Sequence, residues 1–115
     1  MKLSEIVERL DLQVHCCEGR LDQEISRGYA SDLMSDVIAR AQEGDLWVTL
    51  QVHVNVVAVG VMKGLSGVVF VNGREPEPDT LARARDEGLP LLTSGLPAFE
   101  LIGRLYALGV RGARR

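Results

Sequence analysis

The sequence predicts a single three-layer α/β domain with a mainly parallel sheet. Three short apolar runs, at positions 46–51, 66–71 and 89–93, are rich in strand-forming residues and are bounded by turn formers, which is typical of buried strands. Segments with helical spacing separate these runs, as in βαβ units. The length of 115 residues fits one domain, and no stretch has the composition of a linker.

The first third of the chain is expected to contain a helix and two strands. The helix ends at Asp11 and places four apolar residues on one face: Leu3, Ile6, Val7 and Leu10. Residues 12–17 are then predicted to form a strand, Glu18-Gly19-Arg20 a turn, and residues 25–29 a second strand.

A second helix is predicted after Ser31 and Asp32, which are both good N-cap residues. Its apolar residues share one face, and Gly44 is expected to close its C-terminal end. The residues on that face are Leu33, Met34, Val37, Ile38 and Ala41.

The segment that follows gives conflicting signals. Apolar residues alternate with polar ones from Val48 to Val56, which alone would indicate one long strand. Such a strand would far exceed the usual length of about five or six residues. We therefore predict a strand at 46–51, a loop at 52–55, and a buried helix capped by Asn55 that runs to about Lys63.

The second half of the chain is expected to alternate strands and helices. The strand at 66–71 ends in an Asn72-Gly73 turn, and a helix then begins at Asp79 or Thr80 and ends at Gly88. After the strand at 89–93, a last helix has Pro97 in its first turn and Gly109 after its end. One side of this helix is apolar and is expected to face the core: Phe99, Ile102, Leu105 and Tyr106.

Charge and composition narrow the classes of function. A net charge of −3 and a pI near 5.3 argue against a nucleic-acid partner, and the C-terminal arginines 111, 114 and 115 are expected to be solvated. No signal-peptide pattern occurs, and the apolar segment 52–62 is too short to cross a bilayer. We therefore expect a cytoplasmic protein with no membrane partner.

Cys16 and Cys17 are the only cysteines, so no disulfide framework is expected. On a strand the two thiols would point to opposite faces, so they are expected to be ordinary structural thiols without a metal. His15 and His53 are the remaining soft ligands that a zinc site could use, and their spacing from the cysteines does not favour one. We predict neither metal nor cofactor.

The order of several short motifs resembles the DRTGG domain. The matching stretches are Asp32-Leu33-Met34, 44–49, 70–76, 88–93 and Ala98-Phe99-Glu100, and the resemblance spans 25–109. DRTGG domains occur beside CBS modules in some pyrophosphatases and in long phosphotransacetylases, and they are similar to the N-terminal domain of HPr kinase/phosphorylase. Where many members carry Gly-Asp-Arg, this chain has Gln51 to Asn55, and Val71-Asn72-Gly73 stands in place of Thr-Gly-Gly.

The resemblance implies a regulatory module without catalytic residues. Such a module would sense a small anionic metabolite or nucleotide, pair as a homodimer, or bind a metabolic enzyme or signalling protein. Ligands of open parallel sheets bind beyond the carboxyl ends of the strands. The candidate ligand-binding residues at these ends are Thr49, Gln51, His53, Asn55, Asn72, Gly73, Arg74, Thr93 and Ser94. Helix capping and turn formation could also explain each of these residues.

The sequence also allows two enzyme hypotheses. A kinase needs a phosphate-binding loop of the form GxxxxGK[ST], and its nearest approach, residues 60–66, lacks the second glycine before Lys63. The alternative is a small enzyme that uses His53 as a general base, since histidine titrates near neutral pH.

Overall fold

The computed structural model describes residues 1–112, so Arg114 and Arg115 of the basic C-terminal cluster lie outside the described part. The strands are β1 (Gln13–Val14), β2 (Arg27–Ala30), β3 (Asp45–Thr49), β4 (Gly67–Phe70) and β5 (Leu91–Thr93). The helices are α1 (Leu3–Leu10), α2 (Met34–Arg40), α3 (Asn55–Met62), α4 (Pro78–Glu87) and α5 (Ala98–Ala107), with a short 3₁₀ turn η1 (Glu18–Arg20).

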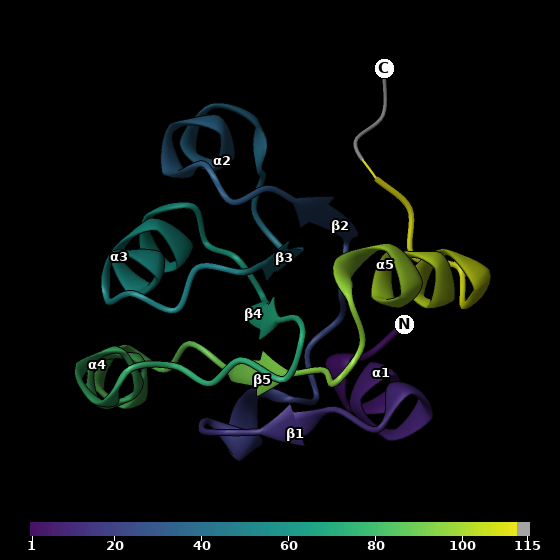
Figure 1. The fold of residues 1–115 in the computed structure, drawn as a ribbon, viewed down its shortest axis with the longest axis horizontal. Helices are drawn as coiled ribbons and strands as arrows, with labels where there is room; N and C mark the ends of the chain where they lie inside the picture. The colour runs from purple at the N-terminus through teal and green to yellow at the C-terminus, as the bar shows by residue number, and fades with distance from the viewer. Residues whose placement is uncertain (113–115) are drawn as a thin grey trace.

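The strands form one five-stranded sheet in the order β1-β5-β4-β3-β2. Strands β2 to β5 are parallel to one another, and β1 pairs antiparallel with β5. Helices α2, α3 and α4 cover one face of the sheet, and α1 and α5 cover the other (Figure 1). The predicted three-layer fold with a mainly parallel sheet is confirmed.

Each face of the sheet has its own hydrophobic core. Trp47, Val68 and Phe70 point toward α2, α3 and α4, where the apolar residues of α3 meet them. Leu46, Val48 and Val69 point to the other face and pack with α1 and α5. The central strands are therefore buried on both sides, which explains their continuous apolar sequence.

The period-two segment folds as predicted into a strand, a loop and a helix. Strand β3 ends at Thr49, and α3 runs from Asn55 to Met62 with Val56 and Val57 fully buried. The predicted cap is wrong by a small shift, because Asn55 is the first helical residue. His53 takes over part of the capping, since its Nδ1 accepts a hydrogen bond from the Asn55 backbone N–H at 3.3 Å.

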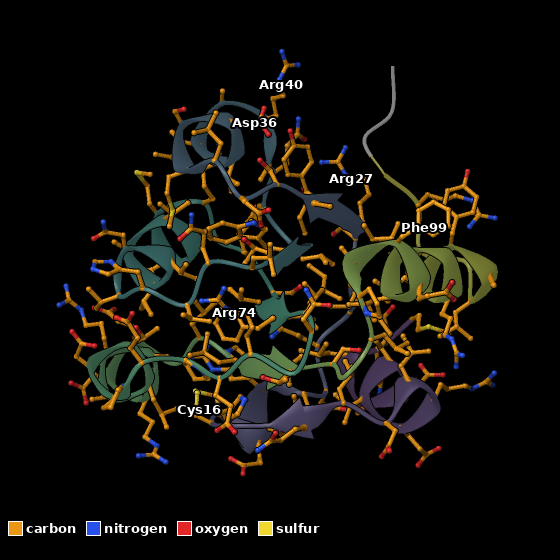
Figure 2. All side chains as sticks on the ribbon, in the orientation of Figure 1. Cys16, Arg27, Asp36, Arg40, Arg74 and Phe99 are labelled. Carbon is orange, nitrogen blue, oxygen red and sulfur yellow. The ribbon has the colours of Figure 1, made fainter. Side chains whose placement is uncertain are left out.

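The first predicted strand is only two residues long, and this changes the geometry of the cysteines. Cys17 has a φ of 66°, so the chain leaves the extended conformation after His15 and turns back. As a result the two thiol sulfurs do not diverge but lie 3.3 Å apart. Cys16 is buried next to the start of β5, where its thiol donates to the carbonyl of Leu89 (Figure 2).

The apolar faces expected for two helices differ from those observed. At α2, Leu33, which precedes the helix, and Ile38 are exposed, whereas Val37 and Ala41 are buried as predicted. On α5 the core contacts come from Leu101 and Leu105, whereas Phe99 is 86% exposed and Tyr106 56% exposed. The predicted core side of α5 is thus wrong except for Leu105. No helix within residues 1–112 is long and apolar enough to span a membrane.

Candidate functional site

Four parallel strands end at the same edge of the sheet, and the loops that follow them meet there. Because β2, β3, β4 and β5 run in the same direction, their carboxyl ends bring together residues far apart in sequence. Figure 1 shows that α5 begins beside these ends, directly after β5. This edge is therefore the natural place for a ligand.

A pocket of about 210 Å³ opens at this edge. Strand β2 leads into Ser31 and Asp32, and β3 leads into Thr49 and Leu50. Asn72 follows β4, and Ala98 is the first residue of α5. The complete lining is Ala30, Ser31, Asp32, Val48, Thr49, Leu50, Val71, Asn72 and Ala98.

Asp32 organises one wall of this pocket. Its Oδ1 accepts a hydrogen bond from the Thr49 hydroxyl at 2.8 Å and another from the Leu50 N–H at 2.7 Å. The Asp32 carbonyl accepts from the Gln51 side-chain amide at 3.0 Å. The Ser31 hydroxyl accepts from the Leu33 N–H at 3.2 Å, and neither Ser31 nor Asp32 caps α2, whose N-cap residue is Leu33. Asp32 thus ties the end of β2 to the end of β3 and brings a carboxylate to the pocket.

The opposite wall is formed by Asn72 and the start of α5. Asn72 has a φ of 59° and Gly73 of 67°, so the chain reverses tightly after β4, as the Asn-Gly pair predicts. The N–H of Asn72 donates to the Leu96 carbonyl at 2.9 Å, which holds this turn against the loop before α5. No side chain within the described residues caps α5, so its first-turn N–H groups are available beside the pocket.

The predicted site residues divide into three groups. Thr49 and Asn72 line the pocket, and Gln51 touches it through Asp32. His53 and Asn55 are exposed at the start of α3, and Gly73 and Arg74 are exposed beyond the turn; none of the four lines the pocket. Thr93 and Ser94 are buried and hold the backbone together.

Asp32, Ser31 and Ala98 were not among the predicted site residues. Asp32 was interpreted as a helix cap, which is the usual role of an aspartate before a helical segment. A positional signal was present, because Ser31 and Asp32 follow a predicted strand in the same way that Thr49 and Asn72 do.

Thr93 connects His15 to the loop after β4. The Thr93 hydroxyl donates to the Arg74 carbonyl at 2.7 Å, and His15 Nε2 lies 2.6 Å from the same oxygen. A hydroxyl has one hydrogen, so His15 must donate through Nε2–H. Burial lowers the pKa of His15, and the nearby Glu75 opposes this effect. The folded protein therefore favours the neutral imidazole.

We expect this pKa shift to make stability depend on pH. Because the folded-state pKa lies below the unfolded value of about 6.5, the unfolded chain binds more protons in that window. The contribution of His15 is then complete above pH 6.5 and declines as the pH falls. Urea unfolding at pH 7.5 and 5.5 should show that wild type loses stability relative to His15→Gln at the lower pH. A gain at the lower pH would contradict this.

The two thiols lie close together, but Cys17 is poorly ionised. Burial and the hydrogen bond to Cys16 raise the pKa of Cys17 to about 12. Within residues 1–112, no three side chains of His, Cys, Asp or Glu cluster in a way that could hold a metal ion. That Cys16 and Cys17 are structural and metal-free stays a prediction.

Comparison with known proteins shows the fold. The chain is similar in structure to the CBS and DRTGG domains of the regulatory region of Clostridium perfringens pyrophosphatase, a structure complexed with the activator diadenosine tetraphosphate. The TM-score is 0.70 at 14% sequence identity, and the match covers 96% of this chain. The chain spans about half of that regulatory region, 47% of its length. No family profile matches the sequence, and no curated protein matches it either. The fold is therefore DRTGG-like.

Proposed function

We propose that this chain is a non-catalytic regulatory module that binds a nucleotide in the pocket at the carboxyl edge of its sheet. The observation that carries the proposal is the convergence of Ser31, Asp32 and Asn72 from two strand ends on one pocket. Ligand sites in open parallel sheets occur at such edges. The similar regulatory region, crystallised with a nucleotide activator, agrees with this class of ligand.

The charges around the pocket indicate how a nucleotide would be oriented. The Asp32 carboxylate repels phosphate but accepts hydrogen bonds from hydroxyl groups, which favours a ribose at this wall. The first-turn N–H groups of α5, beside Ala98, are suited to an anion. The ligand expected from this arrangement carries its sugar at Asp32 and its phosphate near Ala98, so a purely anionic metabolite is a poorer fit.

A thermal-shift screen tests this proposal, because a ligand that binds only the folded protein raises the melting temperature. The probes are AMP, ATP, diadenosine tetraphosphate, acetyl phosphate and inorganic phosphate. We expect the adenine nucleotides to raise the melting temperature of wild type and the two phosphates to have little effect. A flat response to every nucleotide at millimolar concentration would refute the proposal.

Asn72→Gly is the sharpest variant for this test, since glycine keeps the positive φ while the side-chain amide is lost. Loss of one hydrogen bond of about 1 kcal/mol should weaken nucleotide binding about fivefold. The matched control is Asn55→Ala, which removes an amide that does not line the pocket. Equal effects of the two substitutions would place the ligand elsewhere.

The enzyme alternative has less support from the site. His53 lies at the exposed start of α3, where its Nδ1 accepts a hydrogen bond from the Asn55 backbone N–H. A general base is usually oriented by a second polar side chain, and within residues 1–112 no side chain forms a hydrogen bond with His53. We therefore prefer the regulatory function.

Homodimer formation is a second part of the proposal, and the exposed side of α5 supports it. Phe99, in the first turn of α5, is a large apolar side chain that is 86% exposed in the described chain, and it lines neither the strand-end pocket nor the cavity between β2 and α5. Light scattering across a dilution series should show a dimer for wild type and a monomer for Phe99→Glu. The substitution is placed at Phe99 and not at Leu101, because Leu101 is fully buried and a charge there would destabilise the fold itself. A wild-type monomer at high concentration would end the homodimer idea and redirect attention to a metabolic-enzyme or signalling partner.

A further inference from the structure

A second cavity, of about 230 Å³, lies between the edge strand β2 and helix α5. It lies on the face of the sheet that α1 and α5 cover, opposite the face covered by α2, α3 and α4 (Figure 1). Strand β2 presents only Gly28 and Ala30 to this face, and these residues leave the space beside α5 unfilled. The cavity is thus a consequence of these two small residues.

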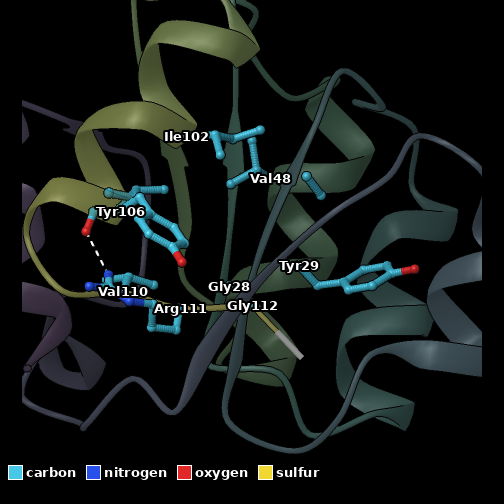
Figure 3. A pocket seen from close by; sticks show the side chains of 10 residues that line it. Gly28, Tyr29, Val48, Ile102, Tyr106, Val110, Arg111 and Gly112 are labelled. Carbon is cyan, nitrogen blue, oxygen red and sulfur yellow. Dashed lines mark hydrogen bonds between the residues drawn. The ribbon is translucent and has the colours of Figure 1, made fainter. Parts of the chain in front are cut away.

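The walls of this cavity are apolar and one end is cationic. Val48 and Leu105 come from the core, Ile102 lies above Val48 in Figure 3, and Val110 comes from the segment after α5. The Arg111 guanidinium lies 4.0 Å from the centre of the Tyr106 ring and donates to the Tyr106 carbonyl at 2.7 Å. No carboxylate within residues 1–112 forms an ion pair with Arg111. Figure 3 shows Tyr29 pointing away from the other side chains.

The cavity adjoins the pocket at the strand ends. Ala30 and Val48 line both, and they are directly paired neighbours on β2 and β3. Each cavity alone is smaller than the roughly 300 Å³ at which small-molecule sites begin, whereas the two together fall within the usual range. The two adjoining cavities are together called the groove: its polar part lies at the strand ends and its apolar part under α5.

The edge of β2 adds one backbone donor to the apolar part. Gly28 already donates its N–H outward to the Arg111 carbonyl at 2.9 Å, which fixes the direction of the open edge. Ala30 lies two residues further along the strand, so its N–H points to the same open side. Backbone groups placed beside an apolar slot can bind the polar edge of a flat heterocycle while its faces contact Ile102 and Tyr106.

We propose that this second cavity binds the base of the nucleotide whose ribose and phosphate occupy the strand-end pocket. The inference rests on the proposed function and adds a specificity element to it. Ile102 and Tyr106 are the residues that discriminate, because they contact the base and do not line the strand-end pocket. The module then recognises a whole nucleoside phosphate, not a sugar phosphate.

The test compares AMP with ribose 5-phosphate by isothermal titration of the full chain. The base should add about tenfold in affinity, in line with base stacking on side chains elsewhere. Ile102→Glu should abolish this advantage and leave the affinity for ribose 5-phosphate within about twofold of the wild-type value. If Ile102→Glu folds poorly, Tyr106→Ala replaces it in the same test. Asn72→Gly should weaken both ligands, and Arg104→Gln, on the same helix outside both cavities, should change neither.

The outcomes separate the two proposals. Equal affinity of wild type for AMP and ribose 5-phosphate would refute the base-binding cavity and leave the strand-end pocket standing. The same conclusion follows if Ile102→Glu and Tyr106→Ala weaken the two ligands to the same degree. Binding of neither compound would refute the proposed function itself.

Discussion

Asp45→Ala is expected to cost about 3 kcal/mol of the free energy of unfolding. Asp45 is 1% exposed at the start of β3, and its carboxylate accepts from the Arg27 Nε and Nη2 atoms, each at 3.2 Å. The same carboxylate accepts from the Gln42 N–H at 2.9 Å. Removing it leaves a largely buried guanidinium on β2 and an unpaired backbone N–H, and such uncompensated groups destabilise a fold strongly.

Urea denaturation measures this effect. Glu87→Ala is the control, because the Arg83–Glu87 pair is exposed and its atoms are 3.6 Å apart, so its loss should be much smaller. A loss for Asp45→Ala as small as that of the control would mean that the Arg27–Asp45 pair does not hold β2 to the sheet. Since β2 forms part of both cavities, a large effect also identifies the contact that positions them.

Leu101→Ala is expected to cost about 3 kcal/mol, whereas Phe99→Ala should change stability little. Leu101 has no exposed surface and packs in the core between α5 and the sheet, whereas Phe99 is 86% exposed. The two residues lie two positions apart on one helix, and we expect the larger side chain, Phe99, to contribute less to the free energy of unfolding than Leu101. Urea unfolding of the two variants at a concentration where the wild type is monomeric provides the measurement.

The opposite ranking would show that α5 docks through its other side. In that case Ile102 and Tyr106 would be core residues, and the groove beside β2 would be closed. The pair of substitutions therefore tests the orientation of α5 independently of any ligand.

The order and layers of the fold could be predicted from the sequence because they follow from strong local signals. Buried parallel strands are apolar throughout, so 46–51, 66–71 and 89–93 were recognisable, and turn residues such as Asn72 and Gly73 marked where they end. Strand length decided the one conflict, since an extended run from Val48 through Val56 would have been too long.

The exposed face of α5 could not be predicted, because the helix has two overlapping apolar stripes. Phe99 and Tyr106 are larger than the buried Leu101 and Leu105, so hydrophobic size and spacing alone favour the wrong side. Only the packing of the whole sheet decides that Leu101 faces the core. The same applies to Cys16 and Cys17, whose approach depends on the left-handed conformation of Cys17 after the short edge strand β1.

The sequence predicts where the candidate site lies, at the carboxyl ends of the parallel strands, but it identifies only some of the residues that line the pocket. Parallel strands fix the edge at which ligands bind, and Thr49 and Asn72 were found by that rule. Thr93 and Ser94 satisfy the same rule but are used to hold the loops after β4 and before α5. The position of Asp32 in the pocket could not be predicted, because an aspartate before a helix is usually a cap.

The most direct test of the account is a titration of the ¹⁵N-labelled protein with AMP, followed by two-dimensional amide spectra. The pocket predicts the largest and saturable shifts at Asp32, Leu50, Asn72 and Ala98, with a second group at Ala30 and Tyr106. The amides of His53 and Asn55 should move little, because they lie outside both cavities. Shifts centred on the start of α3, or none at all at millimolar AMP, would contradict the assignment of a nucleotide site to this edge of the sheet.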